Sequence, residues 1–153
     1  MPKSLQAFLT PRTCILGFGN RLWRDDGVGS RIAEALQACP GMASIDGGFV
    51  PENHLEAVIR TRPDAILMID AADFGGKPGE YRLLNTDDVA LAGISTHAGS
   101  PRMLAQYLQA RTGARVGLLA IQPGDNSEGE QLSTEVAATA GSLVAKIPAL
   151  CRG

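Results

Sequence analysis

One stretch of the chain decides the fold: Gly17-Phe18-Gly19-Asn20-Arg21-Leu22-Trp23-Arg24-Asp25-Asp26-Gly27-Val28-Gly29. A continuous apolar run at residues 13–16 precedes it, and a segment with apolar residues at helical spacing, 28–36, follows it. The first pattern is typical of a buried strand and the second of an amphipathic helix. The stretch is therefore a glycine-rich turn between a strand and a helix. Its glycines allow backbone N–H groups to approach a ligand, and its paired carboxylates favour a cation or an amide.

Working outward from this turn, strand-like and helical segments alternate along the chain. Further strand-like runs occupy residues 42–45, 65–69 and 116–121, and residues 81–84 alternate like an antiparallel edge strand. Further helices are predicted around residues 55–59, from Ser100-Pro101 to Gly113, and over 132–147. The pattern predicts a three-layer α/β/α domain over residues 12–150, with a mainly parallel, mixed sheet of about five strands and helices on both faces. Residues 1–11 are expected to form a loosely attached lead-in.

Composition excludes several classes of protein. The chain has 153 residues, 44% apolar and 20% charged, which fits one globular domain. Its net charge is −2 and its basic residues are scattered, so no nucleic-acid partner is expected. The apolar runs are too short to insert into a membrane, and a cytoplasmic location is expected. The three cysteines have no paired spacing, so neither a disulfide nor a structural zinc site is predicted, and Cys14 is expected to be a buried free thiol.

Acidic residues follow three successive strand-like runs. Asp25 and Asp26 come after the first run, Asp46 after the second and Asp70 after the third, and His97 lies in a loop ahead of a helix. Ligands of open α/β sheets bind outside the carboxyl ends of the strands, so these side chains are expected to meet at one edge. Carboxylates gathered there repel each other unless a positive charge compensates. Oxygen ligands with one imidazole suit a divalent cation such as nickel, zinc or manganese.

Each of these residues also has a structural interpretation. Asp25 or Asp26 can cap the first helix by accepting its free backbone N–H groups. Asp46, which precedes two glycines, can form a turn. Asp70 follows five apolar residues and is expected to be partly buried, so turn formation explains it less well. His54 lies on the polar side of a predicted helix and is expected to have a surface role.

Two other kinds of active site are disfavoured by the sequence. A dinucleotide-binding turn needs a third glycine at position 22, where this chain has Leu22, and the adjacent acids would repel a pyrophosphate. The Gly-x-Ser-x-Gly elbow of serine hydrolases does not occur. From the residues alone, the prediction is therefore an acidic pocket with one histidine on an α/β sheet, of enzymatic type.

At these residues the chain resembles the hydrogenase maturation proteases, over roughly residues 14–144. The glycine-rich stretch resembles the family's opening signature, and Asp46-Gly47-Gly48, Ile69-Asp70-Ala71 and Ser95-Thr96-His97 fall where its later signatures belong. The hydrogenase 3 (formate hydrogenlyase) branch is the most similar, through Pro51-Glu52-Asn53, Pro78-Gly79-Glu80 and Ile121-Gln122-Pro123. The resemblance implies an endopeptidase that removes the C-terminal extension of the [NiFe] hydrogenase large-subunit precursor after nickel insertion.

The resemblance also implies roles for individual residues. Asp26, Asp70 and His97 would be both the catalytic residues and the metal ligands. Substrate binding would fall to a further set: Asn20, Asp46, Gly47 and Gly48. Between the paired acids, Asp26 then has the functional role and Asp25 the structural one.

Nickel would be supplied by the substrate and not held permanently, although other divalent cations can occupy the site. The implied partner is the large-subunit precursor, and the protease is expected to be monomeric. A non-catalytic chaperone that checks the metal of the precursor is the alternative function. Trp23, with Arg21 and Arg24, is expected either to help dock the partner or to lie in a solvated loop.

Overall fold

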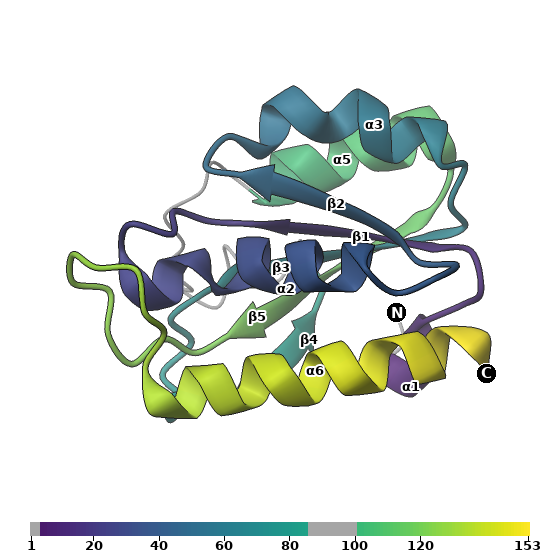
Figure 1. Cartoon of the computed structure of the whole chain (residues 1–153). Coiled ribbons are helices and arrows are strands. Elements are labelled where there is room, and N and C mark those ends of the chain that lie inside the picture. Colours follow the sequence, from purple (N-terminus) through teal and green to yellow (C-terminus); the bar gives the residue numbers. More distant parts are fainter. Residues whose placement is uncertain (1–3, 86–100) are drawn as a thin grey trace.

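A computed structural model describes residues 4–85 and 101–153. Its strands form one five-stranded sheet in the order β2-β1-β3-β5-β4 (Figure 1). The strands are β1 (Thr13–Phe18), β2 (Ala43–Gly48), β3 (Ala65–Ala71), β4 (Tyr81–Leu84) and β5 (Arg115–Ile121). The helices are α1 (Leu5–Phe8), α2 (Val28–Gln37), α3 (Leu55–Arg60), α5 (Pro101–Thr112) and α6 (Thr134–Arg152), with short 3₁₀ turns η1 (Arg24–Gly27) and η2 (Pro51–His54).

The sheet is covered by helices on both faces. Helices α1, α2 and α6 pack on one face against side chains that include Ile15 and Leu67. Helices α3 and α5 pack on the other face, against the alternate strand positions, which include Leu16 and Met68. In Figure 1, α3 and α5 lie above the sheet and α6 lies below it. The arrangement confirms the predicted three-layer architecture.

Four of the five strands are parallel, and β4 is antiparallel to β5 at one edge. The edge strand at residues 81–84 is therefore confirmed. Two parallel strands extend further than their apolar runs suggest, because β2 continues to Gly48 and β3 to Ala71. Asp46 and Asp70 consequently lie within the strand ends rather than in the loops that follow.

The prediction of a loosely attached lead-in is wrong for the part of residues 1–11 that the structure describes. Leu5, Phe8 and Leu9 are buried, and they belong to the same core cluster as α2 and α6. The guanidinium of Arg115 lies 5.3 Å from the centre of the Phe8 ring and donates a 2.6 Å hydrogen bond to the Phe8 carbonyl. Leu5 and Phe8, three residues apart, share one face of α1, which packs on α6.

The state of the cysteines agrees with the sequence-based expectation. Cys14, Cys39 and Cys151 are free thiols, and Cys14 is fully buried in β1. Burial raises the pKa of the Cys14 thiol to about 11, and a hydrogen bond with Thr61 lowers it in part. Among the described residues, none of the helices has the length and apolar character needed to cross a membrane.

Candidate active site

The glycine-rich turn brings α2 into close contact with the sheet. A Cβ at Gly17 would lie 2.0 Å from the carbonyl oxygen of Gly29, and a Cβ at Gly29 would lie 2.1 Å from that of Ile69. Any side chain at either position would push α2 away from β1 and β3. The sequence predicts that a ligand approaches these glycines, but the structure places the backbone of α2 there. The helix thereby begins beside the carboxyl ends of both strands.

Asp25 is fully buried and holds the loop between β5 and α6, residues 122–133, which we call the β5–α6 loop. Its carboxylate accepts hydrogen bonds from the N–H groups of Gly124, Asp125 and Ser133, each 2.8 Å long, and from the Ser133 hydroxyl at 2.7 Å. It does not cap α2, because the N-cap residue of α2 is Gly27 and this helix has no side-chain cap bond. The predicted structural role is therefore confirmed, but the predicted capping is wrong.

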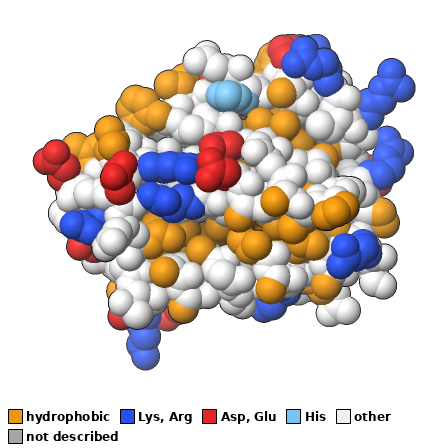
Figure 2. Space-filling view, in the orientation of Figure 1, with side chains coloured by type: hydrophobic (Ala, Val, Ile, Leu, Met, Phe, Trp, Pro, Cys, Tyr) orange, Lys and Arg blue, Asp and Glu red, His pale blue; other side chains and the backbone are white. Residues whose placement is uncertain are grey.

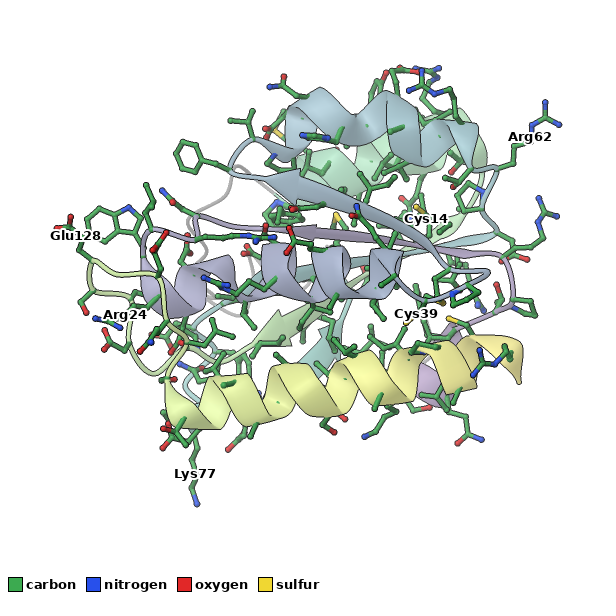
Figure 3. The ribbon with its side chains drawn as sticks, viewed as in Figure 1. Cys14, Arg24, Cys39, Arg62, Lys77 and Glu128 are labelled. Atoms are coloured by element: carbon green, nitrogen blue, oxygen red, sulfur yellow. The ribbon has the colours of Figure 1, made fainter. Side chains whose placement is uncertain are left out.

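The backbone of the turn also pairs with the β5–α6 loop. The N–H of Arg24 donates to the carbonyl of Gly129 at 2.8 Å, and the N–H of Gly129 donates to the carbonyl of Leu22 at 2.8 Å. Figure 3 shows Arg24 and Glu128 together at one end of the molecule, opposite Arg62. The two segments, about a hundred residues apart in sequence, thus form one continuous rim at the carboxyl ends of the strands.

Asp26 points in a different direction from its neighbour Asp25. It is 4% exposed, and its Oδ2 accepts a 3.0 Å hydrogen bond from the backbone N–H of Asn20. Its charge acts on the carboxyl group of Asp70 and raises the pKa of that group. The structure therefore brings together Asp26 and Asp70, two of the three residues predicted to bind metal.

Asp70 is buried at the end of β3, with 1% of its surface exposed. Neither carboxyl oxygen has a hydrogen-bond partner of normal geometry among the described residues. Burial, and then the charge of Asp26, raise the pKa of Asp70 well above its ordinary value, while the backbone amide of Ala71 opposes the shift only in part. A buried carboxyl group without partners is costly, and a bound cation would remove that cost.

Asp46 does not join this pair, which corrects the expectation of one acidic cluster. Its Oδ2 lies 3.0 Å from the guanidinium of Arg21, and its Oδ1 accepts hydrogen bonds from the Ser30 hydroxyl at 2.6 Å and the Gly48 N–H at 2.9 Å. Asp46 of β2 pairs with Gly17 of β1, and Gly17 pairs with Ile69 of β3. The Asp46 side chain therefore lies on the same face of the sheet as that of Ile69, which is the face covered by α2. Side chains alternate along a strand, and Asp70 therefore faces the opposite side.

The other predicted substrate-binding positions have defined structural contacts. The carbonyl of Gly48 accepts a 2.8 Å hydrogen bond from the N–H of Gly19, which joins the loop after β2 to the glycine-rich turn. A Cβ at Gly47 would lie 3.3 Å from Pro51. The side-chain oxygen of Asn20 accepts from the N–H of Leu22 at 3.0 Å. These contacts shape the rim, and substrate binding at these positions stays a prediction.

His97 lies outside the described residues. Within residues 4–85 and 101–153, there is no group of three or more His, Cys, Asp or Glu side chains that could hold a metal ion. The described part of the site therefore offers two carboxyl groups, Asp26 and Asp70, to a cation. The histidine ligand remains a prediction from the sequence.

Two cavities meet at Asp26. The first, of ≈ 260 Å³, has a polar lining: Asp26, Ala71, Asp73, Gln122, Pro123, Gly124, Asp125 and Asn126. The second, of ≈ 410 Å³, is lined by Asn20, Trp23, Asp26, Phe49 and Asn126. Asp26 and Asn126 line both cavities, so the two cavities form one continuous surface. The polar cavity and the cavity that contains Trp23 and Phe49 meet at Asp26.

Sequence reasoning missed several residues of these cavities. Gln122 directly follows β5, and its side chain accepts from the N–H groups of Phe74 and Gly76 and donates to Asp73 at 3.1 Å. The rule that identified the acids, a polar residue directly after a strand, would also have identified Gln122. Phe49 and Asn126 carry no comparable signal, because each is a single residue in a loop.

Comparisons with known proteins agree on one family. The family model described as "Hydrogenase maturation protease" matches residues 28–149. The hydrogenase 3 maturation protease of Escherichia coli K12 is 38% identical over 112 residues, which cover 71% of each chain. A putative hydrogenase maturation protease of Methanocaldococcus jannaschii is 29% identical over 119 residues, covering 71% of this chain and 70% of the relative.

Solved structures give the same result. The [NiFe] hydrogenase maturation protease HycI of Thermococcus kodakarensis KOD1 superposes with a TM-score of 0.86 at 28% identity, covering 96% of this chain and 97% of that one. A crystal structure of a hydrogenase 3 maturation protease superposes with a TM-score of 0.77 at 31% identity, covering 91% and 89%. The structural similarity therefore covers nearly the whole chain.

Proposed function

Since this chain belongs to the hydrogenase maturation protease family, we propose that it removes the C-terminal extension of the [NiFe] hydrogenase large-subunit precursor once nickel has been inserted. One observation supports a dependence on a metal cation: Asp70 is buried beside Asp26, and its side-chain oxygens have no hydrogen-bond partner of normal geometry among the described residues. Two neighbouring carboxyl groups that raise each other's cost of ionisation are stabilised when a cation binds them. Nickel in this proposal belongs to the substrate and is not a resident cofactor.

Asp26, Asp70 and His97 are the proposed ligands of the substrate's nickel. Asp26 is held by the Asn20 N–H, and Asp70 by the end of β3, so both carboxyl groups are positioned before the substrate arrives. Because burial raises its pKa, Asp70 gives up its proton as the cation binds, and binding tightens as pH rises. Bound nickel supplies Lewis-acid chemistry, which polarises the scissile carbonyl or lowers the pKa of a water molecule.

Cleavage of a nickel-loaded precursor tests this proposal. Incubation with the protease should shorten the precursor, as measured by mass spectrometry, while the nickel-free precursor stays uncut. The purified protease should itself contain far less than one nickel per chain. An unchanged mass together with stable binding would favour the metal-checking chaperone instead.

Variants of single acids sharpen the test. Asp26→Ala and His97→Ala should abolish cleavage while far-ultraviolet circular dichroism shows an intact fold. Asp46→Asn is the matched control, because this acid lies at the same edge but faces Arg21 and Ser30. It should retain cleavage within about tenfold of wild type, since only a positioning contact is lost. Normal processing by Asp26→Ala would refute the assignment of the site.

A further inference from the structure

Apolar side chains are concentrated at the end of the molecule that carries Asp26. The described residues include seven large apolar side chains that are exposed, and four of them, Leu22, Trp23, Phe49 and Val50, lie in the loops after β1 and β2. Figure 2 shows apolar side chains gathered at the upper left edge of the face, where β1 and β2 end. Exposed apolar side chains gathered in this way mark a surface for a partner.

Two of these four side chains line the larger cavity next to Asp26. Trp23 is 45% exposed and Phe49 is 71% exposed, and both border the ≈ 410 Å³ cavity together with Asn20 and Asn126. A cavity of this size lies within the range of about 300–1,000 Å³ that is typical of ligand sites. Leu22 and Val50 are their sequence neighbours and are also exposed, but they are not among the residues that line this cavity.

The two aromatic side chains stand on backbone that is already fixed. The N–H of Trp23 donates to the Asn20 carbonyl at 3.1 Å, and its own carbonyl accepts from the Asp26 N–H at 3.0 Å. Phe49 follows Gly48, whose carbonyl is bonded to the Gly19 N–H. An aromatic side chain presented on a fixed backbone binds at a low cost in conformational entropy.

We propose that this cavity binds an apolar side chain of the precursor polypeptide beside the scissile bond, and that Trp23 and Phe49 determine specificity for it. The inference rests on the proposed function, and the shared residue Asp26 makes the cavity continuous with the proposed site of cleavage. The occupant is a polypeptide because the apolar walls take its side chain, while the carboxamides of Asn20 and Asn126 can donate to and accept from its backbone.

Kinetic constants for cleavage of the nickel-loaded precursor give the first readout. Trp23→Ala and Phe49→Ala should each raise KM by about tenfold or more, as expected when an aromatic anchor is removed from a buried contact, with a smaller change in kcat. Phe49→Leu, which keeps an apolar side chain, should restore most of the affinity. Leu22→Ala and Val50→Ala are the matched controls and should stay within about twofold of wild type. Equal effects at all four positions would overturn the proposal.

Fluorine NMR gives a second readout that does not depend on cleavage. Trp23 is the only tryptophan of the chain, so protein labelled with fluorotryptophan gives one resonance from the wall of the cavity. In the Asp70→Asn background, the nickel-loaded precursor should shift this resonance, and Phe49→Asp should abolish the shift. An unmoved resonance on a bound precursor would overturn the proposal. A shift with protein concentration alone would overturn it as well, because a second copy of the chain would then fill the cavity.

The two readouts separate this proposal from the proposed function. If wild type binds the precursor with the Trp23 resonance shifted but never shortens it, the proteolytic function fails and the cavity assignment stands. If wild type cleaves normally while Trp23→Ala and Phe49→Ala leave KM unchanged, the cavity assignment fails and the proteolytic function stands.

Discussion

Asp70 is a carboxyl group that retains its proton at pH values where an exposed aspartate is ionised. Burial and the charge of Asp26 raise its pKa in the folded chain, whereas aspartates of the unfolded chain titrate near a pKa of about 3.9. The folded state therefore binds this proton more tightly than the unfolded state. Its contribution to stability is complete below about pH 4 and is lost as pH rises through the raised pKa.

Asp70→Asn should therefore stabilise the protein at neutral pH. The amide keeps the shape of a protonated carboxyl group but has no charge to bury, so the melting temperature at pH 8 should rise by about 2 °C or more. The difference should shrink as pH falls below about 4, where wild-type Asp70 becomes protonated in the unfolded state as well. Differential scanning calorimetry between these pH values measures the effect.

Asp46→Asn is the matched control for this prediction. It removes the partner of Arg21, so its melting temperature at pH 8 should fall relative to wild type. A variant Asp70→Asn that is less stable than wild type at pH 8 would show that Asp70 is ionised and stabilised in the folded protein, contrary to the raised pKa.

Among the elements, the β5–α6 loop depends on one side chain from the opposite end of the sequence. Asp25→Ala leaves three backbone N–H groups and one hydroxyl without their acceptor. Unsatisfied buried donors cost about 1–3 kcal/mol each, so the variant should lose at least about 3 kcal/mol of unfolding free energy in urea. Hydrogen exchange should rise most in residues 124–133.

Ser133→Ala provides the comparison for Asp25→Ala. It removes only the hydroxyl and leaves the backbone donors in place, so the loss should be about 1 kcal/mol. Equal losses for the two variants would mean that the loop is held mainly by its other contacts.

Most elements could be predicted from the sequence because their apolar residues repeat at the spacing of a strand or a helix. The ends of β2 and β3 could not, since aspartate and glycine have low strand propensity and are held there by pairing with neighbouring strands. The separation of Asp46 from Asp70 depends on the register between strands, which no single strand encodes. α1 was missed because four residues are too few to show a helical period and depend on packing for stability.

Some residues of the candidate site could also be predicted from the sequence, and others could not. Asp26 and Asp70 could be identified because each ends or follows an apolar run at the carboxyl edge of the sheet. The partners of Asp25 could not, because they are backbone N–H groups of the distant β5–α6 loop. Every residue except proline has a backbone N–H group, so the sequence does not show which of these groups bind Asp25.

At the scale of the whole molecule, α1 is important because it covers one face of the sheet together with α6. Phe8 belongs to α1 and its side chain is fully buried in the core. Phe8→Ala should therefore lower the unfolding free energy by about 3–5 kcal/mol. Phe49→Ala makes the same chemical change at a position that is 71% exposed and should stay within about 0.5 kcal/mol of wild type. Urea unfolding followed by circular dichroism measures both. A loss below about 1 kcal/mol for Phe8→Ala would mean that α1 is dispensable.

The hydrogen bonds of Asp25 also determine when the site can exist during synthesis. They join residues separated by 99 to 108 positions, so the rim closes only after β5 and the following loop have left the ribosome. Contacts of such long range form late, because the intervening chain must first be ordered. A partly synthesised chain would therefore contain Asp26 and Asp70 but not the wall that encloses them. Proteolytic activity should therefore appear only after the chain has been synthesised beyond Ser133 and the β5–α6 loop has bound Asp25.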